Sequence, residues 1–363
     1  MKFDKFKRVI ALSGAVLFTI GGLASCGNSS ADSSKESASV EANDVTSTSE
    51  KGALNTASHL NIATQPVPGY LPIQVAQDNG WIEEALAEAG YSDVTVTFTD
   101  FESGPPENES FAAGQQDVGV MGSVPAILAK AAGQDRVYLG VAVNGPKTET
   151  VIVPKDSEIK TVADLKGKKI GLVVGSICEN LVYNLLEKEG LTLNDVELVN
   201  LATSEQQVAL AGKQVDAVAT WQPTIAKLVG DGSNVIIADG TGGVFKAESP
   251  IFGNREYIEQ NPEIVQIFIQ QYARAAYEVE NNKKEYAEKY AESFGLTEDL
   301  LYAALEDSHF QISIEQEDIE DLQKTADFLY NTQKANVQVN FADSVNDSFV
   351  NDDTVKAYLA GEK

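Results

Sequence analysis

Serine, glycine and glutamine residues follow four short apolar segments, at points where each segment gives way to a helical pattern. Ser103-Gly104 follows residues 94–98, Gly122-Ser123 follows 117–121, Gly175-Ser176 follows 169–174, and Trp221-Gln222 follows 216–220. Backbone N–H groups at the start of a helix, helped by nearby hydroxyl groups, can bind an anion without a salt bridge. Each serine taken singly could instead be an ordinary helix cap. Four such junctions in series predict a shared anion-binding cleft.

Residues suited to catalysis are scarce in this sequence. Histidine occurs only at His59 and His309, so no histidine-centred catalytic set or histidine-rich metal site is visible. Gly175-Ser176-Ile177-Cys178 lacks the second glycine of a nucleophile elbow. The glycine-rich run 239–243 has neither the Rossmann spacing nor the lysine of a phosphate loop. We therefore expect a binding protein, not an enzyme, without a cofactor or a metal.

The charge of the chain restricts the classes of partner that it can bind. The formal net charge is −27, and arginine occurs only at positions 8, 136, 255 and 274. A nucleic-acid binder needs a basic surface for its phosphate contacts, so we expect no nucleic-acid partner. Because no arginine cluster is available, an anionic ligand would be held by neutral donors, helix ends or an isolated lysine.

The first 58 residues are predicted to be leader and tether. A basic start precedes an apolar run over residues 9–23 that is short for a membrane span, which is the layout of a signal peptide over 1–25. Leu23-Ala24-Ser25-Cys26 resembles a bacterial lipobox, in which Cys26 would carry two acyl chains, enough for stable anchoring. An ordinary signal peptide with a chance cysteine is the alternative. Residues 26–58 are small and polar and predict a disordered tether.

From Leu60 onward the chain alternates β-branched runs with amphipathic segments. Predicted strands are 60–63, 94–98, 117–121, 136–143, 150–154, 169–174, 196–201, 216–220 and 234–238, with helical segments at 72–90 and 178–189. This alternation predicts parallel βαβ units and an α/β fold. After about residue 251 only helices are expected. Asn261-Pro262 is predicted to cap one of them, and 283–294, 298–306 and 315–332 are predicted to form others.

Several stretches resemble one protein family. Gln65-Pro66 with residues 76–80, Phe101-Glu102-Ser103-Gly104, and residues 117–125 are similar to the first lobe of taurine, aliphatic-sulfonate and nitrate binding proteins. Residues 161–170, Gly175-Ser176, 196–201 and 216–223 resemble the second lobe in the same order. The resemblance covers the chain from about Leu60 to the C-terminal region.

This resemblance implies a two-lobed periplasmic-binding-protein fold of type II, each lobe a sheet flanked by helices, with a helical C-terminal part. Lobe 1 would comprise residues 59–150 and 250–363, and lobe 2 residues 151–249, joined by a hinge of two crossovers. The lobes would close on the ligand by a hinge motion. Carried onto matching positions, ligand contacts would come from Gln65, Ser103, Gly104, Gly122, Ser123, Gly175, Ser176, Trp221 and Gln222.

The implied function is that of a solute-binding lipoprotein of an ABC importer, a monomer on the outer face of the cell membrane with a permease and an ATPase as partners. Its solute would be a small organic anion such as taurine or another aliphatic sulfonate. The alternative solutes are nitrate, bicarbonate and a thiamine-pyrimidine precursor, which could be cargo or the substrate of an enzyme. The alternative role is that of a sensor without transport. Val120 and Ile177-Cys178 depart from the family pattern, which predicts a more apolar cleft that suits a longer tail.

Five residues near the expected cleft have two interpretations each. Glu102, Glu149 and Glu248 could pair with an ammonium group or be solvated rim charges. Lys147 could contact the anion or solvent. Trp221 could stack on the tail of a ligand or be a structural core residue.

Overall fold

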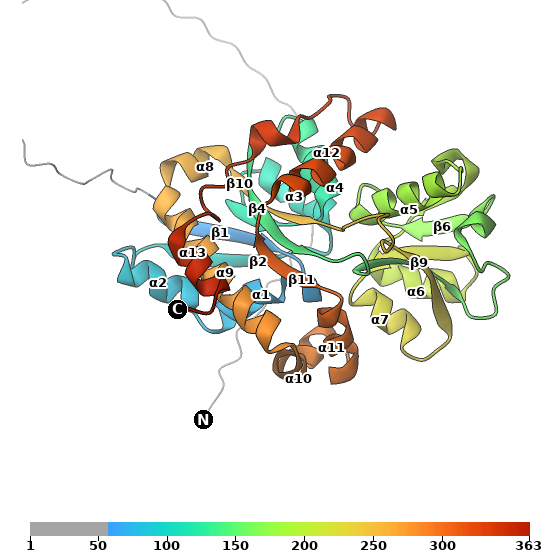
Figure 1. Cartoon of the computed structure of the whole chain (residues 1–363), viewed down its shortest axis with the longest axis horizontal. Coiled ribbons are helices and arrows are strands. Elements are labelled where there is room, and N and C mark those ends of the chain that lie inside the picture. Colours follow the sequence, from blue (N-terminus) through green and yellow to red (C-terminus); the bar gives the residue numbers. More distant parts are fainter. Residues whose placement is uncertain (1–56) are drawn as a thin grey trace, which may run out of the picture. The chain divides into compact units, whose positions relative to one another are not determined.

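The computed structural model describes residues 57–363, and Leu54–Lys363 form one compact unit. The predicted signal peptide, Cys26 and nearly all of the predicted tether lie outside the described residues. Two β-sheets with flanking helices make up the described unit (Figure 1). The α/β fold class expected from the alternating pattern is confirmed.

The first sheet has six strands in the order β11-β4-β10-β3-β1-β2. They are β1 (His59–Thr64), β2 (Thr95–Asp100), β3 (Val118–Val120), β4 (Arg136–Asn144), β10 (Ser249–Asn254) and β11 (His309–Ser313). β1 runs parallel to β2 and β3. The carboxyl ends of these three strands therefore meet at one edge of the sheet, where Gln65, Ser103 and Gly122 follow them.

The second sheet has five strands in the order β7-β6-β8-β5-β9. They are β5 (Glu149–Pro154), β6 (Lys169–Leu172), β7 (Glu197–Asn200), β8 (Ala217–Trp221) and β9 (Asn234–Asp239). β6 is parallel to β7 and β8, so Ser176 and Gln222 follow the same edge of this sheet. The chain crosses between the sheets twice, after β4 and after β9. We call the two parts the first-sheet half and the second-sheet half; the exact lobe boundaries stay a prediction.

The expectation of only helices after residue 251 is wrong. β10 returns to the first sheet and pairs antiparallel with β3 and β4, and β11 pairs antiparallel with β4 at the sheet edge. Strand β10 is buried along most of its length and contains Pro250 and Gly253, so it shows no alternating pattern. β5 is likewise antiparallel to β8 and β9. Both sheets are therefore mixed, not purely parallel.

Two separate apolar cores lie on the two faces of the first sheet. One contains the helices α1 (Leu71–Asp78), α2 (Trp81–Glu88), α8 (Arg255–Gln260), α9 (Pro262–Asn281), α10 (Lys283–Phe294), α11 (Glu298–Glu306) and α13 (Asp353–Leu359). The other contains α3 (Gly104–Ala112), α4 (Ser123–Ala131) and α12 (Gln316–Asn331). In the second-sheet half, α5 (Ile177–Lys188) belongs to one core, and α6 (Thr203–Ala211) and α7 (Thr224–Val229) to another.

Two local predictions about helices need correction. The predicted segment 72–90 is two helices, because Gly80 adopts a left-handed φ of 66° between α1 and α2. Pro262 does open α9, but the Asn261 side chain does not cap it. Its amide instead donates to the carbonyl of Tyr257, 3.0 Å away, and so closes the end of α8.

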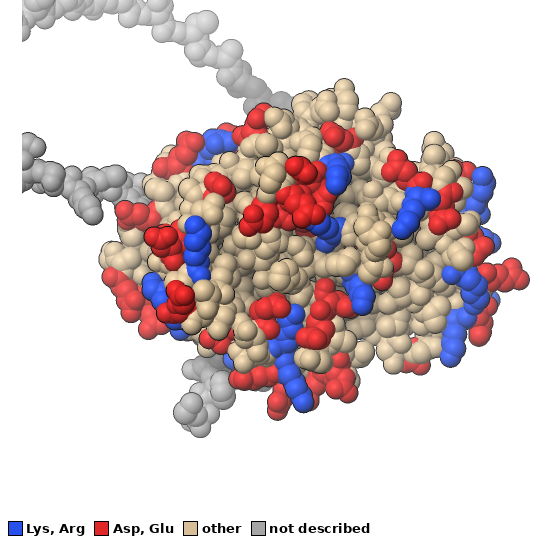
Figure 2. Space-filling view, viewed as in Figure 1, with Lys and Arg blue, Asp and Glu red and all other residues tan. Residues whose placement is uncertain are grey.

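The surface charge of the described part reflects the negative net charge of the sequence. Acidic side chains predominate on the face seen in Figure 2, with lysine and arginine scattered among them. Over residues 57–363, none of the helices combines the length and the apolar character needed to cross a bilayer.

Candidate functional site

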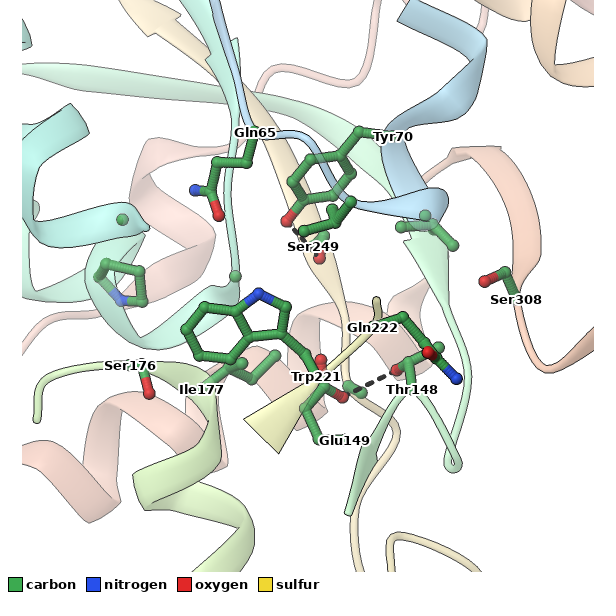
Figure 3. Close-up of a pocket in the computed structure, with 17 residues that line it drawn as sticks. Gln65, Tyr70, Thr148, Glu149, Ser176, Ile177, Trp221, Gln222, Ser249 and Ser308 are labelled. Carbon is green, nitrogen blue, oxygen red and sulfur yellow. Dashed lines mark hydrogen bonds between the residues drawn. The ribbon is translucent and has the colours of Figure 1, made fainter. Parts of the chain in front are cut away.

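A cavity lies between the two halves, and the empty space within it, which includes open solvent, is about 610 Å³ (Figure 3). Its lining residues are Gln65, Val67, Gly69, Tyr70, Gly104, Gly122, Pro125, Val143, Thr148, Glu149, Ser176, Ile177, Trp221, Gln222, Ala247, Ser249 and Ser308. None of these is a lysine or an arginine. An anion bound here would be held by neutral donors, as the scarcity of arginine indicated.

Three helices begin at the cavity, two from one half and one from the other. α3 begins at Gly104 and α4 follows Gly122, while α5 begins at Ile177 after Ser176. The tips of α4 and α5 meet, since a Cβ atom built on Gly122 would lie 3.0 Å from the Cβ of Ile177. The first N–H groups of a helix have no partner within the helix. The two halves therefore present helix N-termini to the same space.

The serines at these tips do not act as helix caps. Neither Ser103 nor Ser176 accepts a capping hydrogen bond through its side chain, and Ser123 lies inside α4 after its N-cap Gly122. The hydroxyl oxygens of Ser123 and Ser176 are buried and have no partner in the described residues. A buried hydroxyl without a partner is costly and rare. Ser176 lines the cavity, so its hydroxyl is available to a ligand there.

Six of the nine predicted contact residues line the cavity: Gln65, Gly104, Gly122, Ser176, Trp221 and Gln222. Ser103, Ser123 and Gly175 do not line it, although each is the chain neighbour of a residue that does. Their role as ligand contacts stays a prediction. Trp221, only 9% exposed, both packs in the core of the second-sheet half and lines the cavity. The two interpretations of this tryptophan are therefore compatible.

Four polar lining residues were missed by the sequence reasoning: Tyr70, Thr148, Ser249 and Ser308. Tyr70 ends a short 3-10 helix (Pro68–Tyr70), and its hydroxyl donates to Ser249, 3.0 Å away. Thr148 lies in the first crossover between the sheets and Ser249 begins β10. Tyr70 is the N-cap residue of α1, and Pro68-Gly69 before it was the signal that could have found it. Thr148, Ser249 and Ser308 do not lie at the start of a helix, and no local pattern marks them.

Of the carboxylates left open, Glu149 alone lines the cavity. Its oxygen accepts a hydrogen bond of 2.7 Å from Thr148. Burial raises the pKa of Glu149 to about 8, and the nearby charge of Glu248 adds to the effect of burial. Glu248 is buried behind the wall, and burial raises its pKa to about 7. Lys147 lies 3.8 Å from Asp307 and is absent from the lining.

Gln65 is held in place by a buried acid. Its amide nitrogen donates to Glu107, 2.8 Å away, and Glu107 has no exposed surface. Burial raises the pKa of Glu107 to about 8, while the charge of Arg136 opposes this. The pair fixes the Gln65 amide at the cavity wall, so Gln65 is available as a pre-positioned polar contact.

Direct contacts join the two halves beside the cavity. Glu102 accepts a hydrogen bond of 2.8 Å from Ser204 in α6, which accounts for a carboxylate whose role was open. Asn180 in α5 donates to Thr325 in α12, 3.0 Å away. Glu179, with no exposed surface, lies 2.5 Å from Lys334 and also accepts from the N–H of Gly175. Glu179 thus links the loop that carries Ser176 to the opposite half.

We expect Lys334→Ala to weaken ligand binding by roughly fivefold, equivalent to about 1 kcal/mol. Without its cation, the buried Glu179 carboxylate would leave a negative charge beside the tip of α5 and loosen the contact between the halves. Isothermal titration with the best ligand checks this. Lys166→Ala removes an exposed pair with Asp195 away from the cavity and serves as the control, with unchanged affinity. Equal affinities for both variants would contradict the linking role.

Known proteins with similar sequences are solute-binding proteins by name. The family model described as NMT1/THI5 like matches residues 68–285. A protein of Escherichia coli (strain K12), provisionally named an aliphatic sulfonates-binding protein, is 31% identical over 61% of this chain and 69% of its own length. A protein of Bacillus subtilis (strain 168) with the same provisional name is 28% identical over 77% and 83%.

Two solved structures are similar to this chain in fold. The alkanesulfonate-binding protein SsuA of Xanthomonas axonopodis pv. citri, bound to MOPS, has a TM-score of 0.73 and 29% identity over 80% of this chain and 98% of its own. The desulfurization enzyme DSZB has a TM-score of 0.61 at 17% identity, over 84% of this chain and all of its own. At that identity the likeness concerns the fold alone.

Proposed function

The chain belongs to the NMT1/THI5-like family, and on that basis we propose that it is the extracytoplasmic solute-binding component of an ABC importer for a small organic sulfonate. The named relatives support this class of ligand. The observation that carries the proposal is that the tips of α4 and α5 meet at the cavity, where the hydroxyl of Ser176 lies in the wall and that of Ser123 lies next to the lining residue Gly122, both without a partner in the described residues.

A sulfonate suits this donor set. It stays ionised at every biological pH and has three weakly basic oxygens, which match N–H and O–H donors without requiring a salt bridge. The rest of the cavity wall includes Val67, Val143, Ile177 and the indole of Trp221. These apolar surfaces would receive the carbon chain of an organic anion and would have little to offer nitrate or bicarbonate.

The remaining parts of the proposal concern place and partners. Lipidation of Cys26 after removal of residues 1–25 would hold the receptor at the outer face of the membrane through residues 26–58. Two acyl chains suffice for stable anchoring. The receptor would then deliver its solute to a permease powered by an ATPase. Extraction of cells tests the anchor. Detergent but not salt should release the wild-type protein from the membrane, and the Cys26→Ala variant should no longer be held there.

A ligand panel tests the function directly. We expect short-chain sulfonates to stabilise the mature domain, by about 2.7 kcal/mol at a hundredfold excess over the Kd. The panel includes nitrate, bicarbonate and a pyrimidine precursor, and a stabilisation by one of these alone would overturn the proposal. All measurements need phosphate or Tris buffer, because many common buffers are themselves sulfonates. The fluorescence of Trp221 in a Trp81→Phe background gives a second readout from the cavity wall.

We expect the Ser123→Ala/Ser176→Ala double variant to bind the best sulfonate about 30-fold more weakly. Two neutral hydrogen bonds of about 1 kcal/mol each account for this loss. Because neither hydroxyl has a partner within residues 57–363, the double variant should unfold no more easily than the wild type. Ser293→Ala/Ser348→Ala, which changes two exposed serines outside the cavity lining, is the matched control. An unchanged Kd in Ser123→Ala/Ser176→Ala would contradict the proposed set of hydrogen-bond donors.

A further inference from the structure

Glu149 is the one acidic or basic residue that lines the cavity. It is the first residue of β5, is 8% exposed, and has Trp221 as its strand partner on β8. An anion in the cavity would share a space of low dielectric with this carboxyl group. Two negative charges in such a space repel each other strongly. The cavity is therefore suited to an anion only when the charge of Glu149 is neutralised.

No cation within residues 57–363 performs this neutralisation. The titratable groups that interact with Glu149 are Glu248 in the second crossover, Tyr70 across the cavity and Cys178 in α5, and each of them is neutral or acidic. The charged side chains of the neighbouring segments have partners of their own. The pairs are Lys147 with Asp307, Lys246 with Glu317 and Asp321, Glu179 with Lys334, Asp239 with Thr241, and Glu107 with Gln65.

The hydrogen bonds of Glu149 favour a proton on its carboxyl group. Within the described residues its one hydrogen-bond partner is the hydroxyl of Thr148, 2.7 Å away (Figure 3). The same hydroxyl lies 2.6 Å from the carbonyl oxygen of Gly145, which can only accept. When Glu149 is ionised, it competes with this carbonyl for the single proton of the hydroxyl. When Glu149 is protonated, it donates to Thr148 and Thr148 donates to Gly145, so both contacts are hydrogen bonds.

A carboxylate is stabilised when several N–H or O–H groups donate to it. Glu149 has at most one such donor, and it shares that donor with Gly145. Burial acts in the same direction and raises the pKa of Glu149 to about 8. An anion bound in the same cavity would raise it further, because a like charge disfavours the ionised form. The neutral acid is therefore the form of Glu149 that suits an occupied cavity.

We propose that the cavity binds its anion together with one proton, which is taken from solvent and held by Glu149. The charge of the anion is then matched by the proton, and neither the protein nor the ligand has to supply a cation. This inference rests on the proposed function and goes beyond it, because it makes capture of the anion dependent on pH.

The affinity for propane-1-sulfonate, which does not titrate between pH 6 and 9, tests the inference. Below pH 7 the free protein already holds the proton on Glu149, so the Kd should be constant. Above pH 8 the free protein loses this proton and must regain it on binding. We therefore expect the Kd to be about tenfold higher at pH 9 than at pH 7. Circular dichroism at pH 9 verifies that the protein remains folded.

Glu149→Gln should remove this pH dependence without removing binding. The glutamine amide has the shape of the protonated acid and can donate to Thr148 in the same way. Its Kd at pH 7 should lie within about threefold of the wild-type value, and the ratio of its Kd at pH 9 to that at pH 7 should fall below about two. At pH 9 the variant should therefore bind more tightly than the wild type. Glu102→Gln, the same change outside the cavity lining, is the control and should keep the wild-type ratio.

Calorimetry of the wild type measures the proton itself and does not depend on any variant. Binding of propane-1-sulfonate at pH 9 should take up most of one proton, whereas binding at pH 7 should take up almost none. Titrations in two buffers of different ionisation enthalpy give the number of protons. Tris and borate serve at pH 9, and phosphate and Tris serve at pH 7.

The outcomes separate the two proposals. Failure of all sulfonates to bind at any pH would overturn the proposed function and this inference with it. Sulfonate binding by the wild type with the same Kd at pH 7 and pH 9 would overturn the inference alone. A pH dependence that persists in Glu149→Gln would assign the proton to another acid, such as Glu248. Proton release on binding, or a large loss of affinity in Glu149→Gln at pH 7, would show that the ionised form is required, and either result would also overturn the inference.

Discussion

We expect Gly122→Val to weaken sulfonate binding by about a hundredfold while both halves of the molecule remain folded. A Cβ atom on Gly122 would lie 3.0 Å from the Cβ and 3.3 Å from the Cγ2 of Ile177, on the opposite side of the cleft. The backbone at Gly122 has φ −59°, which any residue adopts, so the substitution should not strain the chain itself. Valine would therefore push the tips of α4 and α5 apart, at the upper end of the 1–3 kcal/mol typical of overpacking.

The measurement is a titration followed by the fluorescence of Trp221, with circular dichroism to show that the fold is retained. Ile177→Ala in the same chain offers the critical control. It removes the Cγ2 and Cδ1 atoms that valine would meet, so the double variant should recover much of the lost affinity. A Gly122→Val protein that binds like the wild type would show that the two helix tips need not approach each other.

The second large effect concerns stability. Arg136→Ala should lower the free energy of unfolding of the first-sheet half by about 4 kcal/mol. The Arg136 side chain is 2% exposed, and its guanidinium lies 4.5 Å and 4.6 Å from the ring centroids of Phe111 and Phe252. Alanine would leave a cavity between these rings and would deprive Glu107 of a favourable charge. Methionine would refill part of the space, so Arg136→Met should cost less than Arg136→Ala.

Two tryptophans make this measurement specific. Trp81 lies in the first-sheet half and Trp221 in the second, so a Trp221→Phe background reports urea unfolding of the first half alone. Arg255→Ala is the matched control, because Arg255 is partly exposed and pairs with Asp135 at the surface. It should cost less than about 1 kcal/mol. Equal losses for Arg136→Ala and Arg255→Ala would contradict the role assigned to the buried guanidinium.

Local patterns predicted much of the secondary structure correctly. The strands of both sheets up to β9, and the helices α10 and α11, lie close to their predicted bounds. Strand alternation and helical spacing depend only on residues that are close in sequence, so a local pattern can predict them. β10 was missed because it is buried along most of its length and shows no alternation, so its pairing with β4 is what marks it as a strand. β11 was missed although Phe310 and Ile312 alternate with polar residues, a local signal that the sequence reasoning did not use. Their antiparallel return also explains why purely parallel sheets were the wrong expectation.

By itself, the sequence determined the chemical type of the site: neutral donors at helix tips, no arginine cluster, and a tryptophan next to a glutamine at the end of a strand. These are properties of short segments, which propensity and composition report. Only the tertiary structure decided which tips meet, that Tyr70, Thr148, Ser249 and Ser308 join the wall, and that Glu149 is buried there with no cationic partner among residues 57–363. Those facts depend on two crossovers that bring segments more than a hundred residues apart to one cavity, and no local pattern encodes such distances.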